Sequence, residues 1–188
     1  HFREHEFLML TNPVMISTLV GNLGAGTMAS RLGTNTAASQ SYTSMGLAAN
    51  TAVFLPIKIP VAGTILKLWV TNGATATGNI DVGLYDSALG RAVNLLLSAG
   101  STAQSGTSAK QSFDVTDTLV MPGLYFMAVA ADSTSATFAT VSMQSNAQSR
   151  LHGASQQTSA LPLPSTHTFA NMTAASIIDC GVAFRPLV

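Results

Sequence analysis

Short apolar runs separated by turn residues fill most of this chain, and their spacing limits the possible folds more than any other feature. In chain order, the candidate strands are Phe54–Pro60, Thr64–Thr71, Asn79–Asp86, Arg91–Ser98, Ala109–Val115, Leu124–Ala131, Ala136–Met143 and Ile177–Phe184. They follow one another at intervals of roughly 8–15 residues, and no long amphipathic helix interrupts them. The pattern predicts an all-β fold, either an antiparallel β-sandwich or a jelly roll.

Individual segments add detail to this prediction. The prolines in Phe54–Pro60 favour an edge strand, because proline cannot donate to a sheet ladder. The continuous apolar run Leu124–Ala131 indicates a strand that is buried on both faces. Asn72-Gly73 predicts a turn, and Gln144–Thr168 predicts an irregular, poorly ordered stretch.

The first 40 residues differ from the rest. Gly21–Gly26 is rich in glycine and predicts a flexible hinge, and Ser30–Ser44 is small and polar without clear periodicity. Before the hinge, Phe7–Leu10 forms an apolar patch that is unfavourable in water unless a neighbouring subunit covers it. We therefore predict an extended N-terminal arm at residues 1–40 and a β-sandwich domain at residues 41–188.

Charged residues are scarce in this chain. Its 188 residues include 8 Lys or Arg and 8 Asp or Glu, a charged fraction of 9% with zero net charge. A typical soluble domain has about 25% charged residues. Without a basic surplus, the chain is not expected to bind nucleic acid or an acidic membrane surface. A neutral, sparsely charged exterior instead favours a subunit whose surface is covered by neighbours.

Several apolar side chains are candidate contacts with such neighbours. They are Phe2, Phe7, Leu8, Met9, Leu10 and Trp69. If Leu66, Leu68 and Val70 face the core, alternation places Trp69 on the outward face beside Lys67. An outward tryptophan either stacks on a sugar or anchors a subunit interface. The third possibility is that both faces of this strand are buried within one domain.

Motifs with catalytic or metal-binding potential are weak. His1–His5 matches the H-x-x-E-H pattern of a zinc peptidase, but no preceding turn supports a helix there. Asp86, Asp117 and Asp132 fall where turns are expected and should cap backbone N–H groups, with calcium ligation as the alternative. Cys180, the single cysteine, is expected to be a buried apolar side chain. We predict no catalytic residue, no metal site and no cofactor.

Part of the chain resembles a known family. The segments that carry the resemblance are Gly78–Asp86, Ser98–Thr102, Asp114–Leu119 and Pro122–Ala128. In this order they resemble strands of a β-sandwich module in virion structural proteins of tailed bacteriophages, which include head-decoration, neck and tail-associated proteins. The resemblance covers about residues 50–142. It implies a fold and a virion setting, but it marks no catalytic residue.

The resemblance implies a non-enzymatic phage virion protein, either a capsid decoration or cement protein or a minor head or tail subunit. Its expected partners are its own copies, as a trimer rather than a dimer, and a neighbouring capsid or tail protein. The alternative is a carbohydrate-binding β-sandwich module of a receptor-binding fibre, with Trp69, Tyr85 or Tyr125 stacking on sugars. A small hydrolase, based on the H-x-x-E-H pattern alone, is a third hypothesis.

Overall fold

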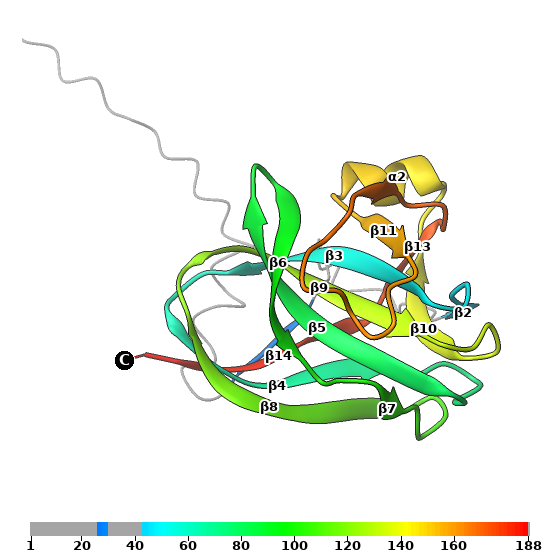
Figure 1. The fold of residues 1–188 in the computed structure, drawn as a ribbon, viewed down its shortest axis with the longest axis horizontal. Coiled ribbons are helices and arrows are strands. Elements are labelled where there is room, and N and C mark those ends of the chain that lie inside the picture. Colours follow the sequence, from blue (N-terminus) through cyan, green and yellow to red (C-terminus); the bar gives the residue numbers. More distant parts are fainter. Residues whose placement is uncertain (1–25, 30–42, 188) are drawn as a thin grey trace, which may run out of the picture.

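The computed structural model describes residues 26–29 and 43–187, which form an antiparallel β-sandwich (Figure 1). One sheet has the strand order β1-β14-β4-β8, with bounds Gly26–Ala29, Cys180–Pro186, Gly63–Thr71 and Lys110–Val120. The largest sheet has the order β12-β11-β3-β9-β5-β6, with bounds Ala170–Asn171, Ser155–Thr158, Thr51–Ile59, Gly123–Ala131, Asn79–Ala88 and Arg91–Ser98. Within it, β7 (Thr102–Ala103) also pairs with β5. The predicted all-β sandwich is confirmed.

Two smaller features complete the described fold. A short sheet has the order β13-β10-β2, with bounds Ser176–Ile178, Thr137–Ser142 and Thr43–Gly46. The helix α2 spans Asn146–Leu151, and the Ser145 hydroxyl caps it by accepting from the Gln148 N–H. A serine at this position is favoured because it satisfies one of the unpaired amides at a helix start.

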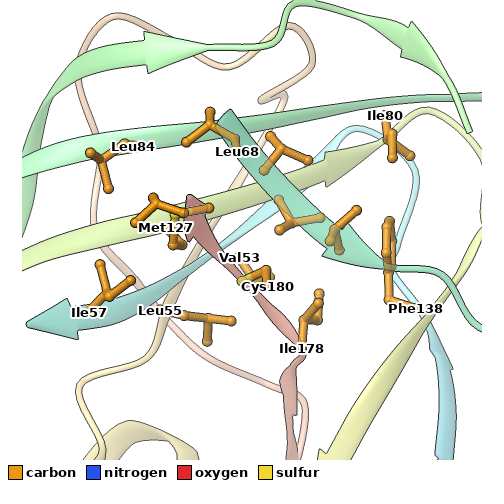
Figure 2. Packing of buried hydrophobic residues seen from close by; sticks show 14 of the residues in the cluster. Val53, Leu55, Ile57, Leu68, Ile80, Leu84, Met127, Phe138, Ile178 and Cys180 are labelled. Carbon is orange, nitrogen blue, oxygen red and sulfur yellow. The ribbon is translucent and has the colours of Figure 1, made fainter. Parts of the chain in front are cut away.

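The main core lies between the four-stranded and the seven-stranded sheets (Figure 2). Leu55, Leu68, Leu84, Met127 and Cys180 come from β3, β4, β5, β9 and β14, and each is fully buried. Alternation along each strand directs these side chains to one face. Burying one such aliphatic side chain stabilises a fold by about 1.5–3 kcal/mol. The prediction that Cys180 is a buried apolar side chain is confirmed.

A second, smaller core lies on the opposite face of the seven-stranded sheet. The segment that follows β11 crosses this face and packs Leu163 against Phe54, Tyr85 and Ala128. Small residues on the strands leave space for it. A Cβ at Gly83 would lie only 2.6 Å from Cδ1 of Leu163. The predicted burial of both faces is confirmed for Phe126–Ala131, where β9 contributes to both cores. It is wrong for Leu124, which is exposed, and Tyr125 is only half-buried.

Buried polar bonds fix the crossing segment to the sheet. The fully buried Asp81 carboxylate accepts from the Ser98 hydroxyl at 2.8 Å and from the Leu163 N–H at 3.0 Å. The Tyr85 hydroxyl donates to the Pro164 carbonyl at 2.5 Å. Burial raises the pKa of Tyr85, and the Asp81 charge raises it further. Tyr85 therefore keeps its proton and remains a donor at physiological pH.

The predicted edge position of Phe54–Pro60 needs correction. Strand β3 lies inside the largest sheet, between β11 and β9. Its pairing with β11 ends at Phe54, however, whereas its pairing with β9 continues past Pro56 to Ile59. Pro56 therefore sits where one side of the strand has no partner, so its missing N–H removes no bond from the ladder.

The C-terminal third of the chain also differs from the prediction. Gln144–Thr168 is not irregular throughout, since it contains α2 and β11. The strand expected at Ile177–Phe184 is divided at Asp179. Before this residue β13 pairs with β10, and after it β14 pairs with β4 and β1. The Thr71 hydroxyl and N–H both donate to Asp179, at 2.9 and 2.8 Å, where the chain passes between the sheets.

Strand β1 belongs to the segment predicted as an arm. Gly26, expected in a flexible hinge, pairs with Phe184, and Ala29 pairs with Gly181. Part of the predicted arm thus adds an edge strand to the four-stranded sheet. Residues 1–25 and 30–42 lie outside the described residues, so the domain boundary near residue 40 stays a prediction.

Candidate functional site

Most of the predicted interface residues lie outside the part of the chain that the structure describes. These are Phe2, Phe7, Leu8, Met9 and Leu10. His1–His5, which carries the H-x-x-E-H pattern, lies outside it as well. Between residues 43 and 187, no three His, Cys, Asp or Glu side chains come together in a way that could hold a metal ion. No helix in the described segments is long and apolar enough to cross a membrane.

Trp69 is the one predicted interface residue that can be located. It lies on the face of β4 opposite Leu68 and Val70, as predicted, but only 4% of it is exposed. The Lys110 ammonium lies 4.0 Å from its ring centroid. Trp69 therefore offers little surface to a sugar or to a neighbouring subunit. The possibility that both faces of this strand are buried fits the structure.

A β-bulge explains a second error in this strand. The pairing of β4 with β8 shifts register between Ile65 and Lys67. Because of this shift, Ile65 enters the core and Leu66 is only half-buried. The extra residue of a bulge reverses the face on which preceding side chains lie. Strict alternation therefore assigned the wrong residue of this pair to the core.

The tyrosines proposed for sugar stacking are poorly placed for it. Tyr85 is fully buried in the second core, where it contacts Phe54 edge to face with ring centroids 5.0 Å apart. Tyr125 is half-buried, and its hydroxyl donates to the Met121 carbonyl at 2.9 Å. The carbohydrate hypothesis, as based on Trp69, Tyr85 and Tyr125, therefore lacks an open stacking face at two of its three residues.

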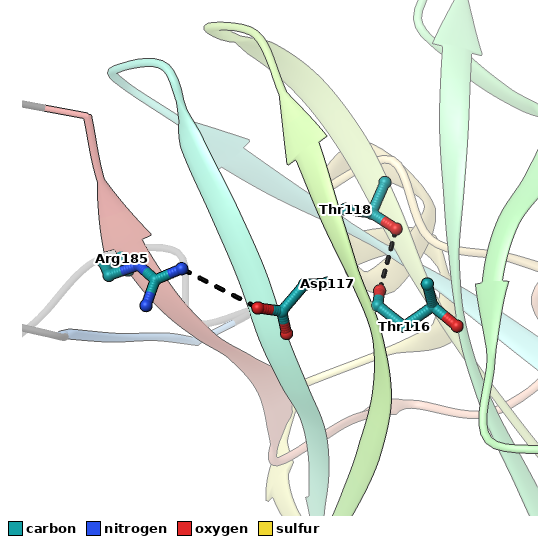
Figure 3. Close-up of polar contacts among 4 residues, drawn as sticks. All are labelled: Thr116, Asp117, Thr118 and Arg185. Atoms are coloured by element: carbon teal, nitrogen blue, oxygen red, sulfur yellow. Dashed lines mark hydrogen bonds and ion pairs between the residues drawn. The ribbon is translucent and has the colours of Figure 1, made fainter.

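Two of the three aspartates predicted to cap turns do bind backbone N–H groups. Asp132 accepts from the Asn79 N–H at 2.8 Å, and Asp86 accepts from the Asn94 N–H at 2.7 Å. Asp117 does not, because it lies within β8 and forms an ion pair with Arg185 at 3.7 Å. Figure 3 shows this pair reaching across β4.

One end of the sandwich exposes a group of apolar side chains, which we call the apolar end. Its members are Val61, Leu119, Met121, Leu124 and Leu187, each between 39% and 61% exposed. Strand pairing brings their turns together. Gly63 pairs with both Val120 and Pro186, and the Leu187 N–H donates to the Ala62 carbonyl at 2.9 Å. The C-terminus marks this end on the left of Figure 1.

The opposite end, which we call the polar end, consists of loops at residues 72–78, 99–109 and 132–136. The fully buried Asn72 amide donates to the Ser105 carbonyl at 2.6 Å and accepts from the Gln104 amide at 3.0 Å. The Gln104 amide also donates to the Thr137 carbonyl at 2.9 Å. The turn predicted at Asn72-Gly73 is not formed, since Asn72 forms an isolated bridge with Phe138. Its buried amide instead joins three chain segments.

A groove lies between the β5–β6 turn and the chain before β12. Its larger part has a volume of about 540 Å³ and is lined by residues that include Leu89, Arg91, Val93, Thr166, His167 and Phe169. An adjoining hollow of about 210 Å³ shares Arg91 and Phe169 and adds Arg150, Ser155 and Asn171. We call the two together the Arg91–Phe169 groove. A concave surface with convergent polar groups is the usual form of a ligand site.

Aromatic contacts organise the walls of this groove. The Arg91 guanidinium lies 4.6 Å from the Phe169 ring centroid, and the His167 ring lies 4.0 Å from Phe54. His167 Nδ1 lies 3.3 Å from the Ala92 carbonyl, which places the donated proton on that nitrogen. Burial lowers the pKa of His167. The bond to Ala92 opposes this change and the charge of Arg91 adds to it. The imidazole is therefore neutral at physiological pH.

Sequence reasoning did not identify this groove. Its two walls are separated by more than 70 positions, between Arg91 and Thr166. One signal was available: arginine is rare in this chain, and Arg91 and Arg150 stand out against its low charge. Neither was singled out, because isolated basic residues have no fixed spacing that indicates a site.

Comparison with known proteins identifies no relative of this chain. No family model, no curated protein and no solved structure matches it. The family indicated by the sequence resemblance therefore stays a proposal.

Proposed function

We propose that this chain is a non-enzymatic structural subunit of a phage virion that binds its own copies, and a neighbouring virion protein, through its apolar end. The observation that carries the assembly part is the exposed group formed by Leu119, Met121 and Leu187 with Val61 and Leu124. The virion setting depends on the sequence resemblance of the strands around Gly78–Asp86 and Pro122–Ala128.

The physics of the apolar end favours association. Apolar surface removed from water contributes about 25 cal/mol per Å². The nearby Arg185 and Asp117 side chains lie 3.7 Å apart, so their opposite charges partly offset each other beside the patch. Repetition of such a contact around a symmetric ring or shell would raise the overall affinity through avidity.

The position of β1 supplies a second argument. Gly26 pairs with Phe184, two residues before the end of β14, so β1 begins close to the apolar end. The apolar segment Phe7–Leu10 lies upstream of this point. An extended chain reaches about 3.3 Å per residue, so this segment has a reach of roughly 50 Å from β1. That reach allows it to bind the apolar end of a neighbouring copy.

Sedimentation velocity of the full chain tests the proposal. We expect concentration-dependent association in the wild type and its loss in the double variant Leu119→Ser, Met121→Ser. Leu151→Ser is the matched control, since Leu151 is an exposed leucine on α2, away from the apolar end. This control should associate as the wild type does.

A companion variant lacks residues 1–20. It should lose most of the self-association if Phe7–Leu10 binds the neighbouring copy. A wild-type chain that stays monomeric at high concentration, or an association that the double variant leaves unchanged, would overturn the proposal.

A further inference from the structure

We propose that the Arg91–Phe169 groove binds a carboxylate-bearing saccharide. This function is separate from assembly through the apolar end, and it uses none of the residues that were first proposed to stack on sugars. Four properties of the groove lead to this ligand class: its charge, its apolar surface, its free polar groups and its rigidity.

The groove concentrates positive charge in a chain with zero net charge. Arg91 and Arg150 both line its smaller hollow, and neither forms an ion pair with an acidic group among residues 43–187. Among the described residues, the Arg150 side chain donates a hydrogen bond only to the Asn146 amide oxygen, at 3.4 Å. A planar guanidinium matches a carboxylate with two parallel hydrogen bonds. The two arginines therefore provide the anchor for an acidic group.

Apolar surface lies beside this charge. Phe169 is 45% exposed and forms a wall common to both parts of the groove, and Val93 contributes to the larger part. Arg91 covers one side of the Phe169 ring, so the remaining aromatic surface is limited. The C–H face of a single sugar ring suits such a surface better than the wider stack of a nucleobase, for which an open aromatic ring is the usual platform.

Uncommitted polar side chains complete the set of contacts. Thr166 and Asn171 line the larger and the smaller part respectively, and their side chains form no hydrogen bond with any described residue. A hydroxyl and an amide can each donate and accept, as sugar hydroxyls require. Charge, apolar surface and amide or hydroxyl partners together match an acidic sugar more closely than a bare anion.

The groove is formed before any ligand binds. Its outer wall follows Leu163 and Pro164, which Asp81 and Tyr85 hold through buried hydrogen bonds. Further along, the His167 N–H donates to the Val93 carbonyl at 2.8 Å. Rigid walls improve affinity because little conformational entropy is lost on binding.

Isothermal titration calorimetry of the full chain tests the proposal. The probes are an oligogalacturonate and sodium glucuronate as polymeric and free sources of the acidic sugar, glucose as its neutral analogue, and sodium acetate as a carboxylate without a ring. We expect the oligogalacturonate and glucuronate to bind, with at least tenfold weaker binding of glucose and acetate. Their affinity should fall as the salt concentration rises.

Substitutions identify the residues responsible. Arg91→Gln and Arg150→Gln should each weaken binding about tenfold, the usual effect of losing a charge-assisted hydrogen bond. Arg91→Lys keeps the charge but loses the paired geometry and should give an intermediate loss. Arg185→Gln is the matched control, since this exposed arginine lies on β14 beside Asp117, and it should change the affinity less than twofold.

Several outcomes would overturn the proposal. They are absence of uronate binding at millimolar concentration, equal binding of glucose or acetate, tighter binding of an acidic peptide, and an affinity that Arg91→Gln leaves unchanged while the thermal unfolding midpoint stays at the wild-type value. Because the probes are small and soluble, none of these results depends on whether the chain assembles.

Discussion

The polar and the apolar end of the sandwich share the strands β4, β8 and β9, but their backbone amides and carbonyls find hydrogen-bond partners in different ways. At the polar end, long loops need partners for their amides and carbonyls, and the side chains of Asn72 and Gln104 supply them. At the apolar end, β8 and β9 are joined by Met121 and Pro122, and the strand ladders continue close to this turn. Side chains such as Met121 are then free to face water.

This difference indicates that the polar end mainly stabilises the fold, whereas the apolar end is available for contacts with other molecules. The polar end contains buried polar groups, each of which is unfavourable if it loses its partner. The exposed side chains of the apolar end contribute little to the fold, since water already contacts about half of their surface. Substitutions at the two ends should therefore have different consequences, and the first of three predictions tests this comparison.

The largest effect is expected for Asn72→Ala at the polar end. The change removes a buried amide, and the Ser105 carbonyl and the Gln104 amide lose a partner. We expect the free energy of unfolding to fall by about 3 kcal/mol, measured by urea denaturation. Leu119→Ser at the apolar end is the comparison, with an expected change within about 0.5 kcal/mol. Equal losses would contradict the division between the ends.

A smaller effect of opposite sign is expected at the β5–β6 turn. Leu89 is fully exposed and has a φ of 51°, and Gly90 follows with a φ of 75°. Two positive φ values define a turn in which Asn-Gly is preferred over a bulky first residue. Leu89→Asn should raise the free energy of unfolding by about 1 kcal/mol.

Leu151→Asn is the control for this turn, because Leu151 is also highly exposed but ends a helix and has no positive φ. It should bring no gain in the same urea measurement. A loss of stability in Leu89→Asn would show that the leucine makes a favourable contact at this turn.

The smallest effect concerns pH and involves neither end. The pKa of His167 is lowered in the fold, so the unfolded chain binds more protons near its ordinary value of about 6.5. Neutral His167 makes its full contribution to the free energy of unfolding above that pH. The contribution decreases as the pH falls through 6.5 toward the lowered pKa. Arg91 is the charged neighbour that adds to this effect.

Thermal unfolding midpoints at pH 7.5 and 5.5 measure the difference. We expect the midpoint to fall less between these values in His167→Gln than in the wild type. His152→Gln, in which an exposed histidine is replaced, should behave as the wild type does. An equal fall in the wild type and in His167→Gln would assign the pH dependence to other groups.

Much of the fold could be predicted because alternation is a local signal. β4, β5, β6 and β9 lie within a few residues of their expected positions, and the burial of Cys180 was predicted as well. The errors occurred where a local pattern met a distant partner. Pro56 is tolerated inside a sheet because the pairing of β3 with β11 stops at Phe54. The partner of Phe54 is Ser155, which lies more than 90 positions later in the sequence.

The candidate sites could be predicted less well. The exposed side chains of the apolar end come from two turns and the C-terminus, and each segment alone is an ordinary turn or end. The burial of Trp69 depends on what lies over the outer face of the sheet, including Lys110. The Arg91–Phe169 groove requires the crossing segment to lie on β5 and β6, which follows from the buried bonds of Asp81 and Tyr85.

The amino-acid sequence by itself determined the class of fold, the approximate strands and the scarcity of charge, because these depend on residue type and on a period of two. Only the tertiary structure decided which apolar residues face water and which arginines share a groove. The physical reason is that burial and electrostatic contact are set by segments far apart in the chain, and their approach depends on the register of the whole sheet.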